Sequence, residues 1–163
     1  MSDNVNLNIL LYEPQIPQNT GNIGRLCVGI NARLHLVKPY GFELSEKKVR
    51  RAGLDYWPHL KLSEYDAWEP KTNRTFLFSK KATKSIFDIE FEKGDWLVFG
   101  AETTGLPSAM METHADKCCI LPMFGEIRSH NLANSVSAAA YLALNSIHKN
   151  RCDLAYDEGN LPQ

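Results

Sequence analysis

Short apolar runs alternate with amphipathic segments along this chain. The apolar runs have the length of strands and are almost continuous: Leu7–Tyr12, Leu34–Val37, Thr75–Ser79, Trp96–Phe99 and Cys118–Leu121. Runs without polar alternation are typical of parallel strands that are covered on both faces. Helical spacing between them predicts helices at Asn19–Asn31, Ser45–Ala52, Ser108–His114 and Leu132–His148. The pattern therefore predicts an α/β fold with a parallel sheet.

Composition narrows the class of protein. The chain has 163 residues, of which 44% are hydrophobic, and no low-complexity linker interrupts it. We expect a single domain over residues 1–163, with a loose tail at 153–163. The net charge of -1 provides no overall basic field. Nucleic-acid binding would therefore need local cationic patches or a partner subunit.

The remaining composition favours a cytoplasmic protein without metal. The four cysteines show no CxxC spacing, which suits reduced thiols in the cytosol. The five histidines lack the spacing of a ligand set, so we expect no metal. No apolar run is long enough to cross a bilayer, and no targeting segment is evident, so we expect a soluble cytoplasmic protein without membrane association.

The turn after the first apolar run is the most informative local feature. It places an amide, Asn19, and two glycines before Arg25, which the pattern suggests is a buried cation. Polar turns also follow later runs, at Gly100–Pro107, Pro122–Ser135 and Ser79–Lys84. Ligands of open α/β sheets bind beyond the carboxyl ends of the strands, so these turns predict a ligand crevice. The alternative is ordinary turn chemistry, in which Asn19 or Thr20 only caps a helix and Arg25 only pairs with a carboxylate.

Several common sites are missing. The chain has no G-x-G-x-x-G, no Walker A loop and no G-x-S-x-G elbow. A dinucleotide or nucleotide-triphosphate cradle and a serine hydrolase therefore lack their usual signatures.

Three ordered segments resemble the motifs of the SPOUT methyltransferases. They read N-x-G-x-x-x-R from Asn19 to Arg25, F-G-x-E-x-x-G-L-P from Phe99 to Pro107, and I-L-P-M at Ile120–Met123 followed by R-S-x-N-L-x-N-S-V at Arg128–Val136. The opening L-Y-E-P-x-I-P-x-N-T-G-N-I-x-R-L-C and the R-R-A-G-L-D-Y that comprises Arg50 and Arg51–Tyr56 resemble more narrowly the TrmL (YibK) type, which are tRNA wobble-nucleotide 2′-O-methyltransferases.

The resemblance implies a SPOUT-type parallel sheet flanked by helices, with a trefoil knot in the carboxyl-terminal part. It implies S-adenosylmethionine as cofactor, without metal, held in the knot. The cofactor-binding residues that it implies are Phe78, Gly100, Glu102, Gly105, Leu121, Met123 and Ser129. A glycine at position 100 would let the cofactor approach the main chain.

The resemblance also implies the acceptor side of the site. Its catalytic residues would be Arg25, Asn19, Ser129 and Asn131. Because a guanidinium holds its proton tightly, we expect Arg25 to polarise the ribose hydroxyl or to clamp the adjacent phosphate. Asn19 would orient the ribose or Arg25, while Ser129 and Asn131 would shape the acceptor side. In the third loop, Ile127 and His130 depart from the commonest family pattern.

The expected substrate is the anticodon stem-loop of tRNA, methylated on the wobble cytidine or on a modified uridine there. Two cationic clusters could contact RNA: Lys47, Lys48, Arg50 and Arg51, with Tyr56 and Trp57 as a stacking surface nearby, and Lys80, Lys81 and Lys84. The apolar surface of Leu132–His148, together with the resemblance, implies a homodimer with composite active sites. Two alternatives stay open: a 2′-O-methyltransferase for another tRNA or rRNA position, and a non-catalytic RNA-binding protein with this fold.

Overall fold

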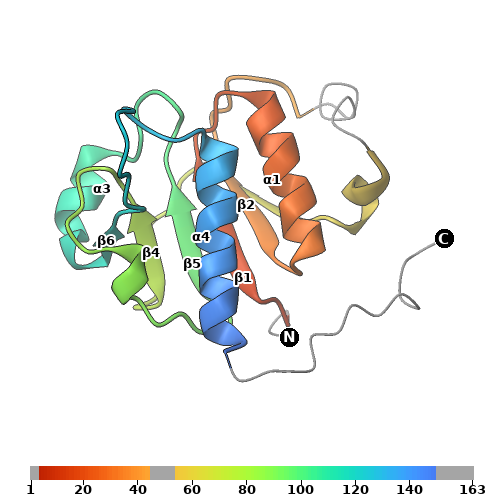
Figure 1. The fold of residues 1–163 in the computed structure, drawn as a ribbon. Coiled ribbons are helices and arrows are strands. Elements are labelled where there is room, and N and C mark those ends of the chain that lie inside the picture. Colours follow the sequence, from red (N-terminus) through yellow and green to blue (C-terminus); the bar gives the residue numbers. More distant parts are fainter. Residues whose placement is uncertain (1–3, 45–53, 150–163) are drawn as a thin grey trace.

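A six-stranded parallel sheet forms the centre of the computed structural model, which describes residues 4–44 and 54–149 (Figure 1). Its strands are β1 (Leu7–Tyr12), β2 (Arg33–Val37), β3 (Lys61–Tyr65), β4 (Thr75–Phe78), β5 (Asp95–Phe99) and β6 (Cys118–Cys119). They lie in the order β3-β2-β1-β5-β4-β6, and every neighbouring pair is parallel. The predicted α/β class with a parallel sheet is confirmed.

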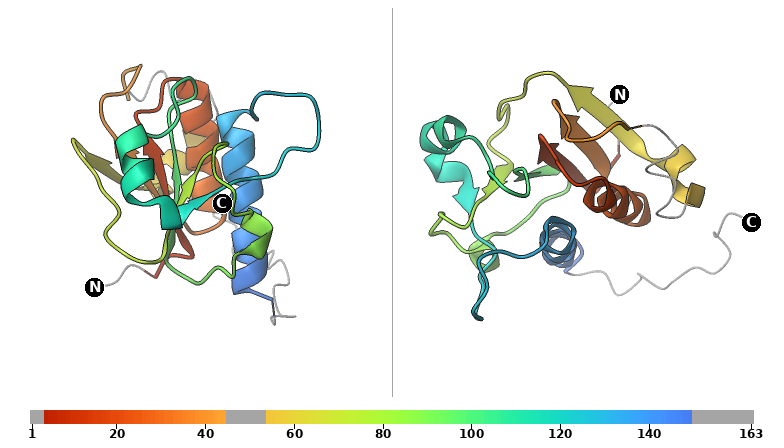
Figure 2. Two further views of the ribbon diagram at one scale, coloured as in Figure 1. Left: turned by 90° about the vertical axis from the view of Figure 1, so that its left-hand side faces the viewer. Right: turned by 90° about the horizontal axis from the view of Figure 1, so that it is seen from above.

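Helices cover both faces of this sheet. The α-helices are α1 (Pro17–Gly29), α3 (Ser108–Thr113) and α4 (Leu132–Ile147), and the 3₁₀ helices are η2 (Leu54–His59), η3 (Ile86–Asp88) and η4 (Ala115–Lys117). Helices α1 and α4 lie side by side on one face, and α3 lies on the other (Figures 1 and 2). The helix predicted at Ser45–Ala52 lies outside the described residues. No described helix is long and apolar enough to span a bilayer.

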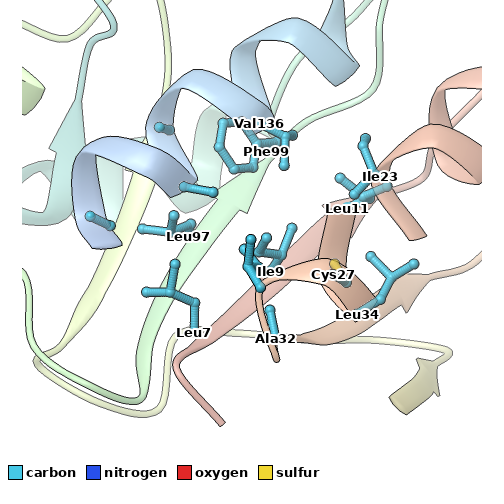
Figure 3. Packing of buried hydrophobic residues seen from close by; sticks show 14 of the residues in the cluster. Leu7, Ile9, Leu11, Ile23, Cys27, Ala32, Leu34, Leu97, Phe99 and Val136 are labelled. Carbon is cyan, nitrogen blue, oxygen red and sulfur yellow. The ribbon is translucent and has the colours of Figure 1, made fainter. Parts of the chain in front are cut away.

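Strand β1 is buried on both faces, which explains its continuous apolar sequence. Leu7, Ile9 and Leu11 point toward α1 and α4 and pack in the larger core cluster (Figure 3). Leu10, one position out of phase, packs with Met110 of α3 in the smaller cluster on the opposite face. The alternation of side chains across a strand thus divides one apolar run between two cores.

Most predicted boundaries agree with the structure to within two residues. Strand β1 is as predicted, whereas β6 ends two residues early, at Cys119. Strand β3 was missed because Lys61–Tyr65 mixes polar and apolar residues, as suits an edge strand that is partly exposed along its length. Helix α1 begins at Pro17, two residues before the predicted start, because proline suits the first helical position. The trefoil knot stays a prediction.

A buried histidine in β2 forms hydrogen bonds to the strands on either side of it, β1 and β3. His35 of β2 lies between the Tyr65 hydroxyl at its Nδ1 and the Asn8 Oδ1 at its Nε2, each 3.0 Å away. Because Asn8 uses its amide nitrogen to donate to the Gly94 carbonyl, Nε2 donates to Oδ1 and Nδ1 accepts from the hydroxyl. Burial, with a smaller contribution from Arg33, lowers the pKa of His35 to about 3, so the ring is neutral at pH 7. His35 is a structural residue of the sheet.

The order of the strands creates a crevice between β1 and β5. The chain leaves β1 toward β2 on one side, and it leaves β5 toward α3 and β6 on the other. The loops that follow these two adjacent strands therefore diverge at the carboxyl edge of the sheet. Such a switch point is where open α/β sheets bind ligands.

Candidate active site

A cavity of about 690 Å³ lies at the carboxyl ends of the strands. This volume falls within the range of small-molecule sites, about 300–1,000 Å³. Every residue that the resemblance assigns to the cofactor lines it: Phe78, Gly100, Glu102, Gly105, Leu121, Met123 and Ser129. Asn19 and Asn131 line it as well. The predicted crevice thus gathers side chains from all three motif segments, and their individual roles stay predictions.

Two stacked aromatic rings form one side of the cavity. Phe78 ends β4 and Phe99 ends β5, and these residues are paired in the sheet. Their ring centroids lie 4.5 Å apart with the planes 9° from parallel. Both residues line the cavity, but Phe99 is buried and only Phe78 is partly exposed, so the Phe78 ring, stacked on Phe99, gives the cavity a flat apolar surface next to polar loops. A surface of this kind suits the face of an adenine ring.

The carboxylate of Glu102 joins the loop after β5 to the loop after β1. One oxygen accepts the backbone N–H of Gln15 at 2.8 Å, and the other accepts that of Ile16 at 3.0 Å. The second oxygen also accepts the side-chain amide of Asn19 at 3.1 Å. Ile16 is the residue that caps α1, so the negative charge lies at the helix N-terminus, where the helix dipole favours it.

Asn19 extends this network to the third motif. Its side-chain oxygen accepts from the Asn131 amide at 3.0 Å while its nitrogen donates to Glu102. The Asn131 oxygen in turn accepts from the backbone of Asn134 and caps α4. Asn19 is buried and lies inside α1, so the alternative in which it merely caps this helix is wrong.

A second contact between the first two loops was missed by the sequence analysis. The Gln15 side-chain oxygen accepts from the backbone N–H of Thr103 at 3.1 Å and from its hydroxyl at 2.6 Å. Glu13, two residues before Gln15, has a φ of 50°, which is uncommon for a residue other than glycine. Because Gln15 and Thr103 meet only through the tertiary fold, no local sequence signal could have identified their contact.

Gly100 is required for a different reason from the one that the sequence suggested. A Cβ atom there would lie 2.0 Å from the carbonyl carbon of Gly105 and 2.2 Å from the nitrogen of Leu106. The loop folds back on itself here, with Gly105 at a φ of 70° and its N–H bonded to the Ala101 carbonyl at 2.9 Å. Backbone packing within the loop excludes a side chain, whether or not a cofactor is bound.

Arg25 stands apart from the other candidates. It is exposed on α1 and is absent from the cavity lining, so the expectation of a buried cation is wrong. It forms no ion pair within residues 4–44 and 54–149, and the alternative of a structural carboxylate partner therefore has no support there. Its catalytic role stays a prediction, and the cavity of its own chain is completed without it.

The structure describes one of the two predicted cationic clusters. Lys80 and Lys81 line the cavity and Lys84 follows them on the same exposed loop. The cluster from Lys47 to Arg51 lies outside the described residues. Tyr56 does not form the predicted stacking surface, because it is buried and its hydroxyl donates to the Gly21 carbonyl at 2.7 Å.

The described part of the chain contains no metal site, and two of its cysteines are made unreactive by burial. Residues 4–44 and 54–149 contain no group of three side chains that could hold a metal ion. Cys27 and Cys119 are buried free thiols. Burial raises the pKa of Cys119 to about 12 and that of Cys27 further, which keeps both thiols protonated and unreactive at pH 7.

Comparison with known proteins gives a consistent result. The sequence model of the SpoU rRNA Methylase family matches residues 6–141. The tRNA (cytidine(34)-2'-O)-methyltransferase of Burkholderia pseudomallei is 42% identical over 144 residues, covering 83% of this chain and 92% of that protein. The protein of the same name from Escherichia coli is 42% identical over 143 residues, covering 84% and 91%. A solved structure described as "Structural insights into the 2-OH methylation of C/U34 on tRNA" superposes with a TM-score of 0.80 at 41% identity, covering 86% of this chain and 95% of its own.

We predict that Gly100→Ala destabilises the protein in the absence of any ligand. The added methyl group meets backbone atoms that cannot rotate away, so we expect a loss of about 1–3 kcal/mol in the free energy of unfolding, measured by urea denaturation. Gly125→Ala is the matched control, because a Cβ there meets nothing within 4 Å. Equal stability of the two variants would show that the turn can open without cost.

We predict that Asn19→Asp is also destabilising, although the two side chains have nearly the same shape. Aspartate cannot donate to Glu102, and it places a second negative charge against that carboxylate in a buried position. The expected loss is about 1–3 kcal/mol at pH 7 by chemical denaturation. Asn22→Asp, on an exposed position of the same helix, should leave stability nearly unchanged. A similar effect of both substitutions would contradict the bridging role of Asn19.

Proposed function

Because this chain belongs to the SpoU rRNA Methylase family, we propose that it methylates the ribose 2′-oxygen of the tRNA wobble nucleotide, using S-adenosylmethionine. The observation that carries the proposal is that residues of all three motif segments line the same cavity at the switch point of the sheet. Relatives at about 42% identity over most of the chain are named for cytidine 34, which makes this nucleotide the first substrate to test. The proposal includes a modified uridine at the same position and a cytoplasmic location.

The residues present fit the cofactor. The ring of Phe78, stacked on the buried ring of Phe99, offers an aromatic surface to an adenine, and the backbone of the turn from Gly100 to Gly105 borders the same space. Leu121 and Met123 add apolar surface, and Glu102, which belongs to that turn, directs its carboxylate to the loop after β1. When bound, S-adenosylmethionine supplies a methyl group that is already activated by its sulfonium. No metal is needed for this transfer.

The protein's task is then to hold the acceptor hydroxyl in line and to assist the loss of its proton. Asn19 is fixed between Glu102 and Asn131, so its orientation toward the acceptor side is set before any substrate arrives. Ser129 is an exposed hydroxyl at the rim of the cavity, placed to contact the ribose. Preorganised polar groups of this kind lower the barrier because they need no rearrangement during the reaction.

The place of Arg25 supports a composite site in a homodimer. Its side chain is exposed on α1 and does not line the cavity of its own chain. Helices α1 and α4 lie side by side on one face, and Tyr141 of α4 is 61% exposed there. A twofold interface through this face would let Arg25 of one protomer serve the cavity of its partner. The proposed architecture also includes the carboxyl-terminal trefoil knot.

The decisive experiment is methyl transfer to total tRNA. The protein is incubated with isotopically labelled S-adenosylmethionine and a chelator, and the tRNA is digested and mapped by mass spectrometry. We expect one labelled 2′-O-methyl group, at the wobble nucleotide. A parallel incubation with ribosomal RNA tests the other substrate class that the family name suggests. Methylation elsewhere would replace the substrate, and the absence of transfer to either RNA would contradict the enzyme proposal.

Mixed dimers test the composite site. Arg25→Ala should lower methyl transfer by at least a hundredfold and leave cofactor affinity within a few-fold, because it removes an interaction made in the transition state. Ser129→Trp should fill the cavity at an exposed rim position and abolish cofactor binding. When the two inactive variants are mixed and refolded, random pairing makes half of the dimers mixed. Each mixed dimer contains one intact site out of two, so up to a quarter of the wild-type activity should return. A dimer by light scattering without any rescue would place Arg25 and the cavity of each site on the same chain.

A further inference from the structure

The loop between β6 and α4 exposes an unusual amount of apolar surface. Phe124 is 90% exposed, the largest fraction among the exposed large hydrophobic side chains of the described residues, and Ile127 is 54% exposed. The loop stands out from the body of the protein (Figure 2, left). A phenylalanine this exposed contributes nothing to the core, and an exposed apolar patch commonly marks a binding surface.

This apolar surface adjoins the cavity. Met123 and Arg128, which flank the segment from Phe124 to Ile127, both line the cavity, whereas Phe124 and Ile127 do not. Phe124 therefore belongs to the surface around the mouth and not to the space for the cofactor. The loop thus lies directly beside the cavity.

The charges at the mouth indicate the chemistry of that molecule. Lys80, Lys81 and Arg128 line the cavity, and none forms an ion pair within residues 4–44 and 54–149. Glu102 is the one carboxylate among the described lining residues, and three donors already occupy it. The available charge is thus positive, which attracts phosphates and opposes the pairing of this patch with the same patch of a second copy.

We propose that Phe124 is a stacking platform for a base of the RNA substrate next to the reacting nucleotide, with Lys80, Lys81 and Arg128 contacting the flanking phosphates. The inference rests on the proposed function, since it assumes that RNA is the substrate. Single-stranded RNA is recognised by aromatic rings that stack on unpaired bases, combined with cations that follow the backbone. The sequence analysis gave a stacking role to Tyr56 and Trp57, of which Tyr56 is buried and Trp57 does not line the cavity.

Direct binding tests the platform without requiring turnover. A fluorescent anticodon stem-loop is titrated in the presence of the demethylated cofactor. Phe124→Ala should weaken binding about 5- to 150-fold, the range that corresponds to loss of one base–aromatic stack. Phe124→Trp should retain affinity, and Phe124→Leu, which keeps apolar area but has no ring, should not. Phe87→Ala is the matched control, because Phe87 is 59% exposed and does not line the cavity.

A stacking signature separates this role from a general apolar contact. 2-Aminopurine placed beside the target nucleotide should lose fluorescence on binding to the wild-type protein, and Phe124→Leu should abolish that quenching. Cofactor affinity, thermal stability and particle mass should be the same for all the Phe124 variants. Wild-type affinity or quenching in Phe124→Leu would overturn the proposal, as would a fall in particle mass, which would make the loop an interface between copies.

The outcomes distinguish this inference from the proposed function. A wild-type protein that binds the stem-loop but transfers no methyl group contradicts the proposed function, and the Phe124 variants still decide the stacking role. A protein that methylates the wobble nucleotide and whose Phe124→Ala variant binds normally keeps its function and loses the platform. A wild-type protein that binds no RNA overturns both.

Discussion

The carboxylate of Glu102 is the contact on which the geometry of the site depends. It follows β5, and its three donors belong to the loop after β1 and the first turn of α1. Two adjacent parallel strands naturally send their loops in different directions at a switch point. A carboxylate that accepts two backbone N–H groups and one side-chain amide holds those loops together. Asn131, which caps α4, donates to Asn19 and so connects this helix to the same network. The cavity is therefore bounded by segments that are far apart in sequence and are joined by a few polar bonds.

The loop after β5 illustrates how function and packing share the same residues. The turn from Ala101 to Gly105 must be tight to present Glu102, and that tightness leaves no room for a side chain at Gly100. Conversely, the left-handed conformation of Gly105 permits the turn. A substitution at Gly100 therefore disturbs this turn whether or not it also affects ligand binding. Inactivity of a Gly100 variant would by itself say little about cofactor contacts.

The site divides into a part that one chain completes and a part that it leaves open. The cavity, its aromatic side and the network around Asn19 are formed within one chain. Arg25 and the exposed ring of Phe124 face solvent instead. Groups that bind a small cofactor benefit from being fixed in advance, whereas groups that meet a large RNA must remain accessible on the surface. The net charge of -1 provides no general attraction for RNA, so groups of this kind have to act locally.

The sequence alone determined the elements and their class, because burial on both faces of a parallel sheet leaves continuous apolar runs such as Leu7–Tyr12. It also located the edge of the sheet that carries the cavity, since the turns after β1, β5 and β6 carry glycines and polar groups, and every residue that the motif resemblance selected except Arg25 lines this cavity. It missed β3, whose mixed sequence reflects an edge position that only pairing with β2 reveals. Tertiary structure alone decided the partners of Glu102 and Gln15, the reason for Gly100, the burial of Tyr56 and the exposure of Arg25. These features depend on contacts between residues as much as 112 positions apart, which local spacing does not encode.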